Sequence, residues 1–265
     1  MLLVIDAGNS NVTFGVYEGD FLLTHWRIRT EAERTADEYA AFLGSLFFQH
    51  DFQFAQITGI ALASVVPNAT PALRRLAANA FRQEALEVTA QTDLGLDIAY
   101  QPPGDVGADR LVDAAAAVHK YGAPCIVIDF GSATTFNAIA APDLPGGRPV
   151  YLGGAICLGI GLSLDALFAK AAKIPRVTLA APPAAIGGNT AQALQSGIVL
   201  GTLALAEGLI ARFRAEMNAP DCPVIATGGF ASALLASESA AITHLEPHLT
   251  LDGLRLVYER NRPAA

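Results

Sequence analysis

Two short acidic turns, one in each half of the chain, have residue types that suit the binding of phosphate. The first is Asp6-Ala-Gly-Asn-Ser10 and the second is Asp129-Phe-Gly-Ser-Ala133. A glycine in such a turn lets backbone N–H groups approach an oxyanion closely. The leading aspartate would repel a phosphate directly, but it can hold a cation that bridges to one. Both turns are therefore candidates for binding a phosphorylated ligand together with its cation, with Asp6 and Asp129 as the candidate metal ligands.

The two turns have the same sequence context, which indicates an internal duplication. Each follows a short apolar run, Leu2 to Ile5 or Cys125 to Ile128, and each is followed by Thr-Phe. A single turn of this kind is also ordinary hairpin chemistry and carries no function by itself. Two of them at the same place in two halves would face one cleft from opposite sides, which suits the phosphates of a nucleotide.

A third candidate lies at the start of a helix that we expect to begin near Val106. It reads Gly107-Ala-Asp109-Arg110 and places Asp109 in the first helical turn. The helix N-terminus stabilises a carboxylate there, so we expect the ionised form to be favoured. An ionised aspartate could act as general base for a hydroxyl that attacks phosphorus, and Arg110 could hold an anionic group. An aspartate in a first turn is also common in helices without any function, and spacing alone leaves both interpretations open.

Two further motifs also allow a structural and a functional interpretation. Asn189-Thr190 resembles a helix N-cap, and capping alone would explain it. Thr227-Gly228-Gly229 directly follows a predicted strand, where Gly228 could contact an adenine or ribose by close backbone approach, although a plain turn is equally consistent.

The elements expected around these residues form two similar α/β halves, and we place their boundary at 118/119. In the first half the pattern predicts strand, turn and strand, a third strand, a helix, a strand and a helix. Those elements are expected at 2–5, 12–17, 21–28, 36–48, 57–65 and 71–81, followed by the helix from 106. In the second half, strands are expected at 125–128, 136–140 and 224–226, with helices at 162–172 and 190–217.

The composition excludes several classes of binding protein. The net charge is -8 and no basic stripe is visible, so we expect no nucleic-acid partner. With only three lysines, an anionic substrate would be held mainly by backbone N–H groups, arginines and metal ions. The chain contains neither G-x-x-x-x-G-K-[ST] nor G-x-G-x-x-G, which disfavours Walker-type and Rossmann-type phosphate sites.

The remaining features predict a cytoplasmic protein without a membrane partner. Its three cysteines include no C-x-x-C pair, so neither a disulfide framework nor a zinc site is indicated. The residues Met1 to Ile5 lead directly into Asp6 without the charged and apolar regions of a signal peptide. The most apolar stretch, Ile198 to Ala206, is well short of the roughly 20 residues that span a bilayer.

With these motifs in the order described, the sequence resembles the type III pantothenate kinases, also described as Bvg accessory factor homologues. The resemblance runs along nearly the whole chain. It covers the blocks at 6–13, 63–67, 107–110, 129–135, 153–156, 187–190 and 227–229. It implies the duplicated ribonuclease H-like, actin-like ATPase fold of the acetate and sugar kinase, Hsp70 and actin superfamily, with lobes at 1–118 and 119–265 and a central cleft.

The resemblance also implies an activity and a role for each matching position. The activity is the phosphorylation of pantothenate by ATP to 4'-phosphopantothenate, the first step of coenzyme A biosynthesis, with Mg²⁺ and a monovalent cation, K⁺ or NH₄⁺. Asp109 corresponds to the proton acceptor and Asp129 to the ligand of the monovalent cation. The ATP contacts would be Asp6, Ala7, Gly8, Asn9, Ser10, Asn11, Val12, Thr13 and Ser132, with Gly228 as a further candidate. The pantothenate contacts would be Tyr100, Gly107, Ala108, Asp109, Arg110 and Thr190, and members of this family are typically homodimers.

Three positions depart from the family pattern, and two rival functions stay open. Ser132 stands where threonine is usual, Leu158 where proline is usual, and Gly188 where lysine or arginine is usual. The Gly188 departure removes a cation, so pantothenate affinity or dimer packing could differ. Because fold does not fix the substrate, the rivals are another kinase or phosphohydrolase of the superfamily and a non-catalytic regulatory homologue.

Overall fold

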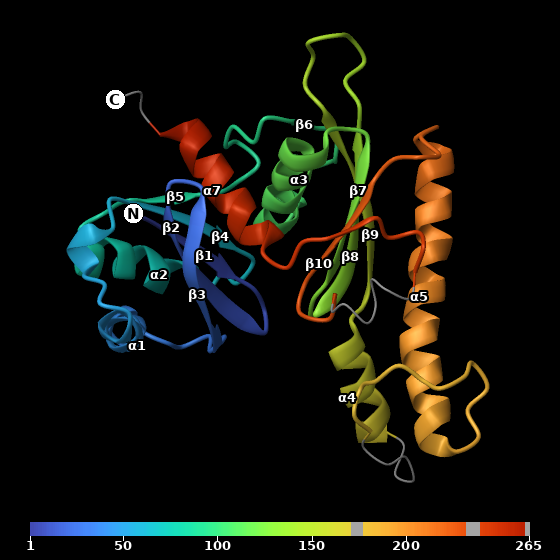
Figure 1. The fold of residues 1–265 in the computed structure, drawn as a ribbon. Helices are drawn as coiled ribbons and strands as arrows, with labels where there is room; N and C mark the ends of the chain where they lie inside the picture. Colours follow the sequence, from blue (N-terminus) through green and yellow to red (C-terminus); the bar gives the residue numbers. More distant parts are fainter. Residues whose placement is uncertain (171–176, 232–238, 263–265) are drawn as a thin grey trace. The chain divides into compact units, whose positions relative to one another are not determined.

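The computed structural model describes residues 1–170, 177–231 and 239–262 of the chain, which divide into two compact units (Figure 1). Unit 1 comprises Met1–Ala116 and Thr250–Ala265, and unit 2 comprises Ala117–Leu249. The lobe boundary expected at 118/119 stays a prediction about domains. The compact units differ from the expected lobes because the last part of the chain belongs to unit 1.

Unit 1 is built on a five-stranded sheet in the order β3-β2-β1-β4-β5. Strand β1 is antiparallel to β2 and parallel to β4; β2 and β3 are antiparallel, whereas β4 and β5 are parallel. The strands are β1 (Leu2–Ala7), β2 (Asn11–Glu18), β3 (Phe21–Arg29), β4 (Gly59–Ser64) and β5 (Ala85–Glu87), and the two-residue β6 is Asp97–Ile98. The helices are α1 (Ala36–Gln49), α2 (Thr70–Leu76), α3 (Ala108–Tyr121) and α7 (Leu249–Asn261), of which α3 begins in unit 1 and α7 lies in it from Thr250. Short helical turns lie at Phe54–Gln56, Ala77–Phe81 and Pro103–Asp105.

The five strands that belong to unit 2 repeat this arrangement in the order β9-β8-β7-β10-β11, within a sheet of six strands. Its central strand β7 is antiparallel to β8 and parallel to β10, as β1 is to β2 and β4. The strands are β7 (Cys125–Phe130), β8 (Ala133–Ala140), β9 (Val150–Leu158), β10 (Val224–Thr227) and β11 (His244–Leu245). The helices are α4 (Ile160–Lys170) and α5 (Thr190–Glu216). The duplication that the two acidic turns predict is therefore present in the topology.

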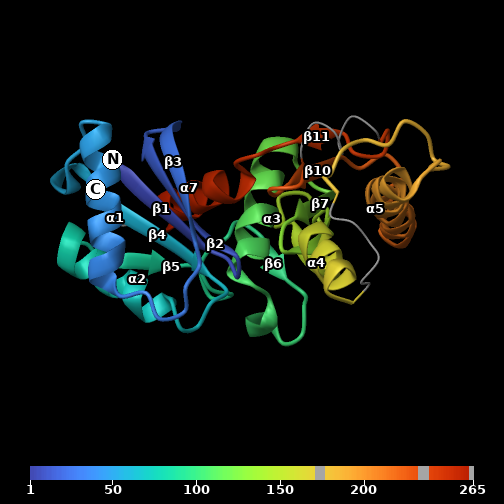
Figure 2. The same cartoon turned by 90° about the horizontal axis from the view of Figure 1, so that it is seen from below.

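Strand β1 is apolar from Leu2 to Ile5, before Asp6, because helices cover both faces of the sheet there. Leu3, Val4 and Ile5 of β1 are all fully buried, which is expected of a strand with two covered faces. Leu3 and Ile5 pack in a core with Leu43 of α1, whereas Val4 lies on the face that α7 covers (Figure 2). The strand ends are thereby held in fixed positions, and the acidic turns follow directly from those ends.

The sequence patterns predict no element at β5, β6, β9, β11 or α7. Among the elements that they do predict, three helices differ from the prediction. The helix expected at 71–81 is α2 followed by a π-helical turn from Ala77, which ends at Arg82 in the left-handed conformation (φ 59°). The helix expected near 106 begins at Ala108, after a turn of 3₁₀ helix. The helix expected at 162–172 is α4, and residues 171–172 lie outside the described residues.

Helix α5 agrees with the helix expected at 190–217, but it is apolar over more of its length than the stretch considered at 198–206. Among the described residues it alone is long and apolar enough, by length and composition, to cross a membrane, and 28% of its most apolar window is buried. Core helices of soluble proteins have the same length and composition. Residues on either side of the stretch considered at 198–206 are also apolar or small, so the apolar part of α5 is longer than that stretch. The expectation that the protein has no membrane partner stays a prediction.

Candidate active site

The first acidic turn is fixed by hydrogen bonds from a neighbouring segment. Asp6 lies opposite Thr13 of β2 on one side and Ala63 of β4 on the other. It therefore lies on the central strand of the sheet, near the carboxyl end of that strand. The Gly8 N–H donates to the Asn11 carbonyl over 3.0 Å. Residues 9–11 are exposed. The turn therefore presents polar groups at the carboxyl end of β1.

Thr30, which no sequence pattern singled out, holds this turn from the outside. Its hydroxyl donates to the Gly8 carbonyl over 2.6 Å, and its N–H donates to the Ser10 carbonyl over 3.0 Å. Both turn carbonyls are thereby directed toward Thr30. The sequence could not reveal this role of Thr30, because a threonine just after a strand is common and its hydrogen-bond partners are some 20 residues earlier in the chain.

The Asp109 carboxylate lies at the start of α3 in a space that only glycine leaves open. Its Oδ1 accepts a hydrogen bond from the Arg110 N–H over 2.8 Å. A Cβ atom at Gly107 would lie 2.5 Å from that oxygen and 3.1 Å from Cγ1 of Val65. Gly107 is thus required by the close approach of a carboxylate on one side and an apolar side chain on the other.

Val65 joins this helix start to the first acidic turn. Its N–H donates to the Ala7 carbonyl over 3.0 Å, and its side chain borders Gly107. Unit 1 therefore brings the Asp6 turn and the Asp109 helix start to the same neighbour. Arg110 and Ala108 are buried, and Tyr100 is half-buried in the segment that leads to α3.

The electrostatics of Asp109 differ from the sequence expectation. Burial raises the pKa of the Asp109 carboxyl, and the Arg110 N–H and guanidinium lower it by less. The expectation that the helix N-terminus favours the ionised form is therefore wrong in its net direction, because desolvation outweighs the local donors. A raised pKa brings the group closer to neutral pH, where a general base is most effective.

In unit 2 the Asp129 carboxylate is bordered by glycine backbone. Asp129 lies opposite Thr135 of β8 and Thr227 of β10. Gly228 has φ +94°, and a Cβ there would collide with Oδ1 of Asp129. A Cβ at Gly131 would lie 3.0 Å from Oδ2. Both oxygens therefore face space that a larger residue would fill.

This arrangement fits a hard cation, which prefers carboxylate and carbonyl oxygens. The described residues contain no cluster of three or more His, Cys, Asp or Glu side chains, so any cation would take its other ligands from backbone, water or substrate. Gly228 is interpreted from the sequence as a nucleotide contact or as part of a plain turn. Its proximity to Asp129 follows from the parallel register of β7 and β10, which no local pattern reveals.

The other two predicted residues of unit 2 lie in ordinary structural settings. The Ser132 carbonyl lies against Gly159, where any side chain would overlap it. Thr190 is exposed and opens α5, whose N-cap Asn189 accepts a hydrogen bond from the Gln192 N–H over 3.0 Å. The capping interpretation of Asn189 is therefore confirmed. Contacts of Ser132 and Thr190 with ligands stay predictions.

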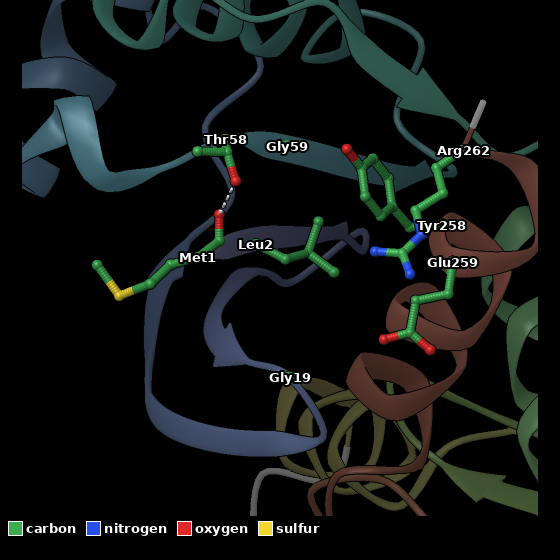
Figure 3. A pocket seen from close by; sticks show the side chains of 8 residues that line it. All are labelled: Met1, Leu2, Gly19, Thr58, Gly59, Tyr258, Glu259 and Arg262. Atoms are coloured by element: carbon green, nitrogen blue, oxygen red, sulfur yellow. Dashed lines mark hydrogen bonds between the residues drawn. The ribbon is translucent and has the colours of Figure 1, made fainter. Parts of the chain in front are cut away.

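One cavity of unit 1 lies away from these residues. It measures about 310 Å³ and opens at the amino ends of β1 and β4, beside the last turns of α7 (Figure 3). Its lining is Met1, Leu2, Gly19, Thr58, Gly59, Tyr258, Glu259 and Arg262. It includes none of the predicted site residues, because the acidic turn lies at the opposite ends of the same strands.

Comparisons with known proteins identify the family of the chain. A family model described as type III pantothenate kinase matches residues 2–212. A type III pantothenate kinase of Roseiflexus castenholzii is 48% identical over 262 residues, covering 99% of this chain and 100% of the relative. Another, from Brevibacillus brevis, is 45% identical over 262 residues with the same coverage.

Solved structures with low sequence identity share the fold. A protein titled as a conserved putative Baf family transcriptional activator from Campylobacter jejuni has a TM-score of 0.58 at 19% identity, with 98% of each chain covered. MreB 5 of Spiroplasma citri bound to AMPPNP has a TM-score of 0.52 at 10% identity, covering 98% of this chain and 96% of the other. The expected actin-like ATPase fold class is confirmed. Since the family model matches most of its length and close relatives match nearly all of it, the chain belongs to the type III pantothenate kinase family.

Proposed function

We propose that this protein transfers the γ-phosphoryl group of ATP to the primary hydroxyl of pantothenate, giving 4'-phosphopantothenate and ADP in the first step of coenzyme A biosynthesis. Membership of the family supports the reaction. The observation that carries the mechanism is the Asp109 carboxylate, which lies at the start of α3 with a raised pKa and a shared neighbour with the phosphate turn.

Asp109 is the proposed general base. It accepts the proton of the pantothenate hydroxyl as that oxygen bonds to the γ-phosphorus and the bond from phosphorus to the β,γ-bridging oxygen breaks. The Arg110 N–H donates to Oδ1 and so helps to orient the carboxylate. General-base assistance of this kind contributes roughly 10² to 10⁴ in rate. Arg110, Gly107, Ala108, Tyr100 and Thr190 are the proposed pantothenate contacts.

The ATP phosphates are proposed to lie against the turn at residues 6–13, with Ser132 and Gly228 as further contacts. Asp6 would hold Mg²⁺ and Asp129 the monovalent cation, K⁺ or NH₄⁺. When bound, these cations neutralise charge on the transferred phosphoryl group. The chain itself supplies only three lysines, so backbone donors carry much of the remaining anion binding.

We also propose that the protein is a homodimer in the cytoplasm, with an apolar face of unit 2 covered by a second copy. Alternate residues of β9 are exposed and apolar, namely Leu152, Ile156 and Leu158, with exposed fractions of 42%, 65% and 64%. Neighbouring helices add Leu162 of α4 and Leu205 of α5. Exposed apolar groups on this scale favour an interface. Light scattering of the wild type should give twice the 27.6 kDa chain mass, and I156D should give the single mass; a monomeric wild type would refute the dimer.

A coupled assay of ADP release from ATP and pantothenate tests the main proposal. We expect turnover that depends on K⁺ and falls at least about 10² in Asp109→Asn, because the amide cannot accept the proton. Thermal melting shows whether the variant stays folded. Asp105→Asn, an exposed acidic residue just before α3, is the matched control and should keep full activity.

A panel of acceptors separates the proposal from its rivals. Turnover of hexoses without turnover of pantothenate would assign another kinase of the superfamily. ATP binding without any product would favour a non-catalytic homologue. Either result contradicts the assignment of pantothenate as the substrate.

A further inference from the structure

Helix α7 meets α3 at a point where the backbones of the two helices touch. A Cβ atom at Gly253 would collide with the carbonyl oxygen of Val112, and would lie 2.7 Å from its carbonyl carbon and 3.0 Å from its Cβ. Real Cβ atoms essentially never approach other atoms so closely. Gly253 is thus a contact position that only glycine can fill without moving one helix.

The place of this contact along α3 makes it relevant to the site. Val112 lies three residues after Asp109, about one helical turn along the same rigid element. On another side, Gly107 and Asp109 border Val65. The start of α3 therefore has two fixed neighbours, the segment after β4 and the backbone of α7.

Helix α7 is itself anchored to the sheet of unit 1. The Tyr17 hydroxyl of β2 donates to Oδ1 of Asp252 over 2.6 Å. Nη1 of Arg255 lies 2.6 Å from Oδ1 of Asp20, in the turn between β2 and β3. Leu251 packs 3.2 Å from the Cβ position of Gly15. The sheet thus fixes the position of α7, and α7 contacts α3 through Gly253.

We propose that Gly253 is a positioning residue for the phosphoryl transfer: α7 sets the position of the first turn of α3, and so the position of the Asp109 carboxylate. The inference rests on the proposed role of Asp109 as general base. It extends the functional part of the chain to a helix beyond residues 2–212, the range that the family model matches. Small displacements of a reacting group, near 1 Å, can cost about 10² in rate.

Gly253→Ala is the direct test, with Gly44→Ala in α1 as the matched control. Both place a methyl group on a helix of unit 1, but the nearest atom to the Cβ position of Gly44 is 3.8 Å away, an ordinary contact. We expect G253A to lower kcat at least about tenfold, with KM for ATP changed less than about twofold. G44A should leave both unchanged. Circular dichroism and thermal melting establish that each variant is folded at the assay temperature.

A double-mutant cycle with Asp109→Asn separates positioning from general damage. If Gly253 acts through Asp109, then G253A should lower kcat by less than about twofold in the D109N background. An equal loss in both backgrounds would overturn the inference, as would wild-type kcat in folded G253A. A wild type that does not phosphorylate pantothenate at all would instead refute the proposed function.

Tyr17→Phe keeps the inference testable if G253A does not fold. It removes the hydrogen bond to Asp252 without adding atoms, so α7 loses an anchor and keeps its shape. We expect a kcat loss of about threefold that again disappears in the D109N background. A loss of the same size in both backgrounds would overturn the positioning role.

Discussion

The two units place an aspartate in the same position of the same strand order, but surround it differently. Asp6 lies between Thr13 and Ala63, and Asp129 lies between Thr135 and Thr227. In unit 1 the next residue of the parallel strand is Ser64, whose hydroxyl accepts hydrogen bonds from the Val66 N–H and the Thr70 hydroxyl.

In unit 2 the equivalent residue is Gly228, whose backbone lies against the Asp129 carboxylate. The hairpin of unit 2 is also one residue shorter, with Gly131 and Ser132 between β7 and β8 where Gly8, Asn9 and Ser10 separate β1 and β2. The duplicated scaffold therefore fixes where each carboxylate lies, and the neighbouring residue sets how closely backbone surrounds it. Asp6 keeps an exposed turn beside it, whereas Asp129 is confined by backbone.

The largest effect that tests this comparison is on stability. Gly228→Ala combines a left-handed backbone, costing about 1–2 kcal/mol, with overpacking against Asp129, costing about 1–3 kcal/mol. We expect a loss of at least about 2 kcal/mol in the free energy of unfolding, measured by urea denaturation. Gly8→Ala, whose Cβ position is 3.3 Å from the Asn11 carbonyl, should lose less than about 1 kcal/mol. Equal losses would mean that the two turns are equally confined.

The second effect sharpens the assignment of cations. Asp129→Asn removes the charge of the proposed monovalent-cation ligand, so the K⁺ concentration for half-maximal activity should rise at least about tenfold. Asp6→Asn should raise the Mg²⁺ requirement instead and leave the K⁺ requirement within about twofold. Titration of each variant with KCl and MgCl₂ measures both. A shift of the K⁺ requirement in Asp6→Asn alone would reverse the assignment.

The smallest effect concerns Asp109 and needs a pH series. Because burial raises its folded-state pKa, wild type loses stability as pH rises through that pKa, since the unfolded chain ionises more readily. Asp109→Asn should therefore be the more stable protein at pH 7, and the difference should vanish below about pH 3.9, the usual pKa of aspartate. Urea denaturation at several pH values gives the curve. If the free energy of unfolding of wild type rose relative to that of the variant with increasing pH, the pKa of Asp109 would be lowered by folding instead.

Local sequence patterns predicted the strands and helix ends whose structure is determined by residues adjacent in the sequence. Apolar runs ending in acidic turns located β1 and β7, and the residues before Asp109 located the start of α3 to within two residues. The features that escaped prediction depend on distant parts of the chain. The pKa of Asp109 follows from burial, which overrides the helix terminus, and the contact between Gly228 and Asp129 follows from strand register.

The assignment of α7 to unit 1 escaped prediction for the same reason. Its sequence is that of an ordinary amphipathic helix, and nothing in it reveals that Leu251 packs beside Gly15 of β2 or that Gly253 meets Val112. A duplicated chain predicts two contiguous halves. In the structure, the residues from Thr250 onward belong to unit 1 instead of unit 2.

The packing of α7 in unit 1 affects the order in which the chain can fold during synthesis. Residues 249–261 emerge from the ribosome only after all of unit 2, so α7 cannot cover the face of the first sheet around Val4 and Gly15 before then. Domains generally fold as their own residues become available. Unit 1 therefore completes its packing only after unit 2 has been synthesised, and until then the apolar face that α7 covers is exposed.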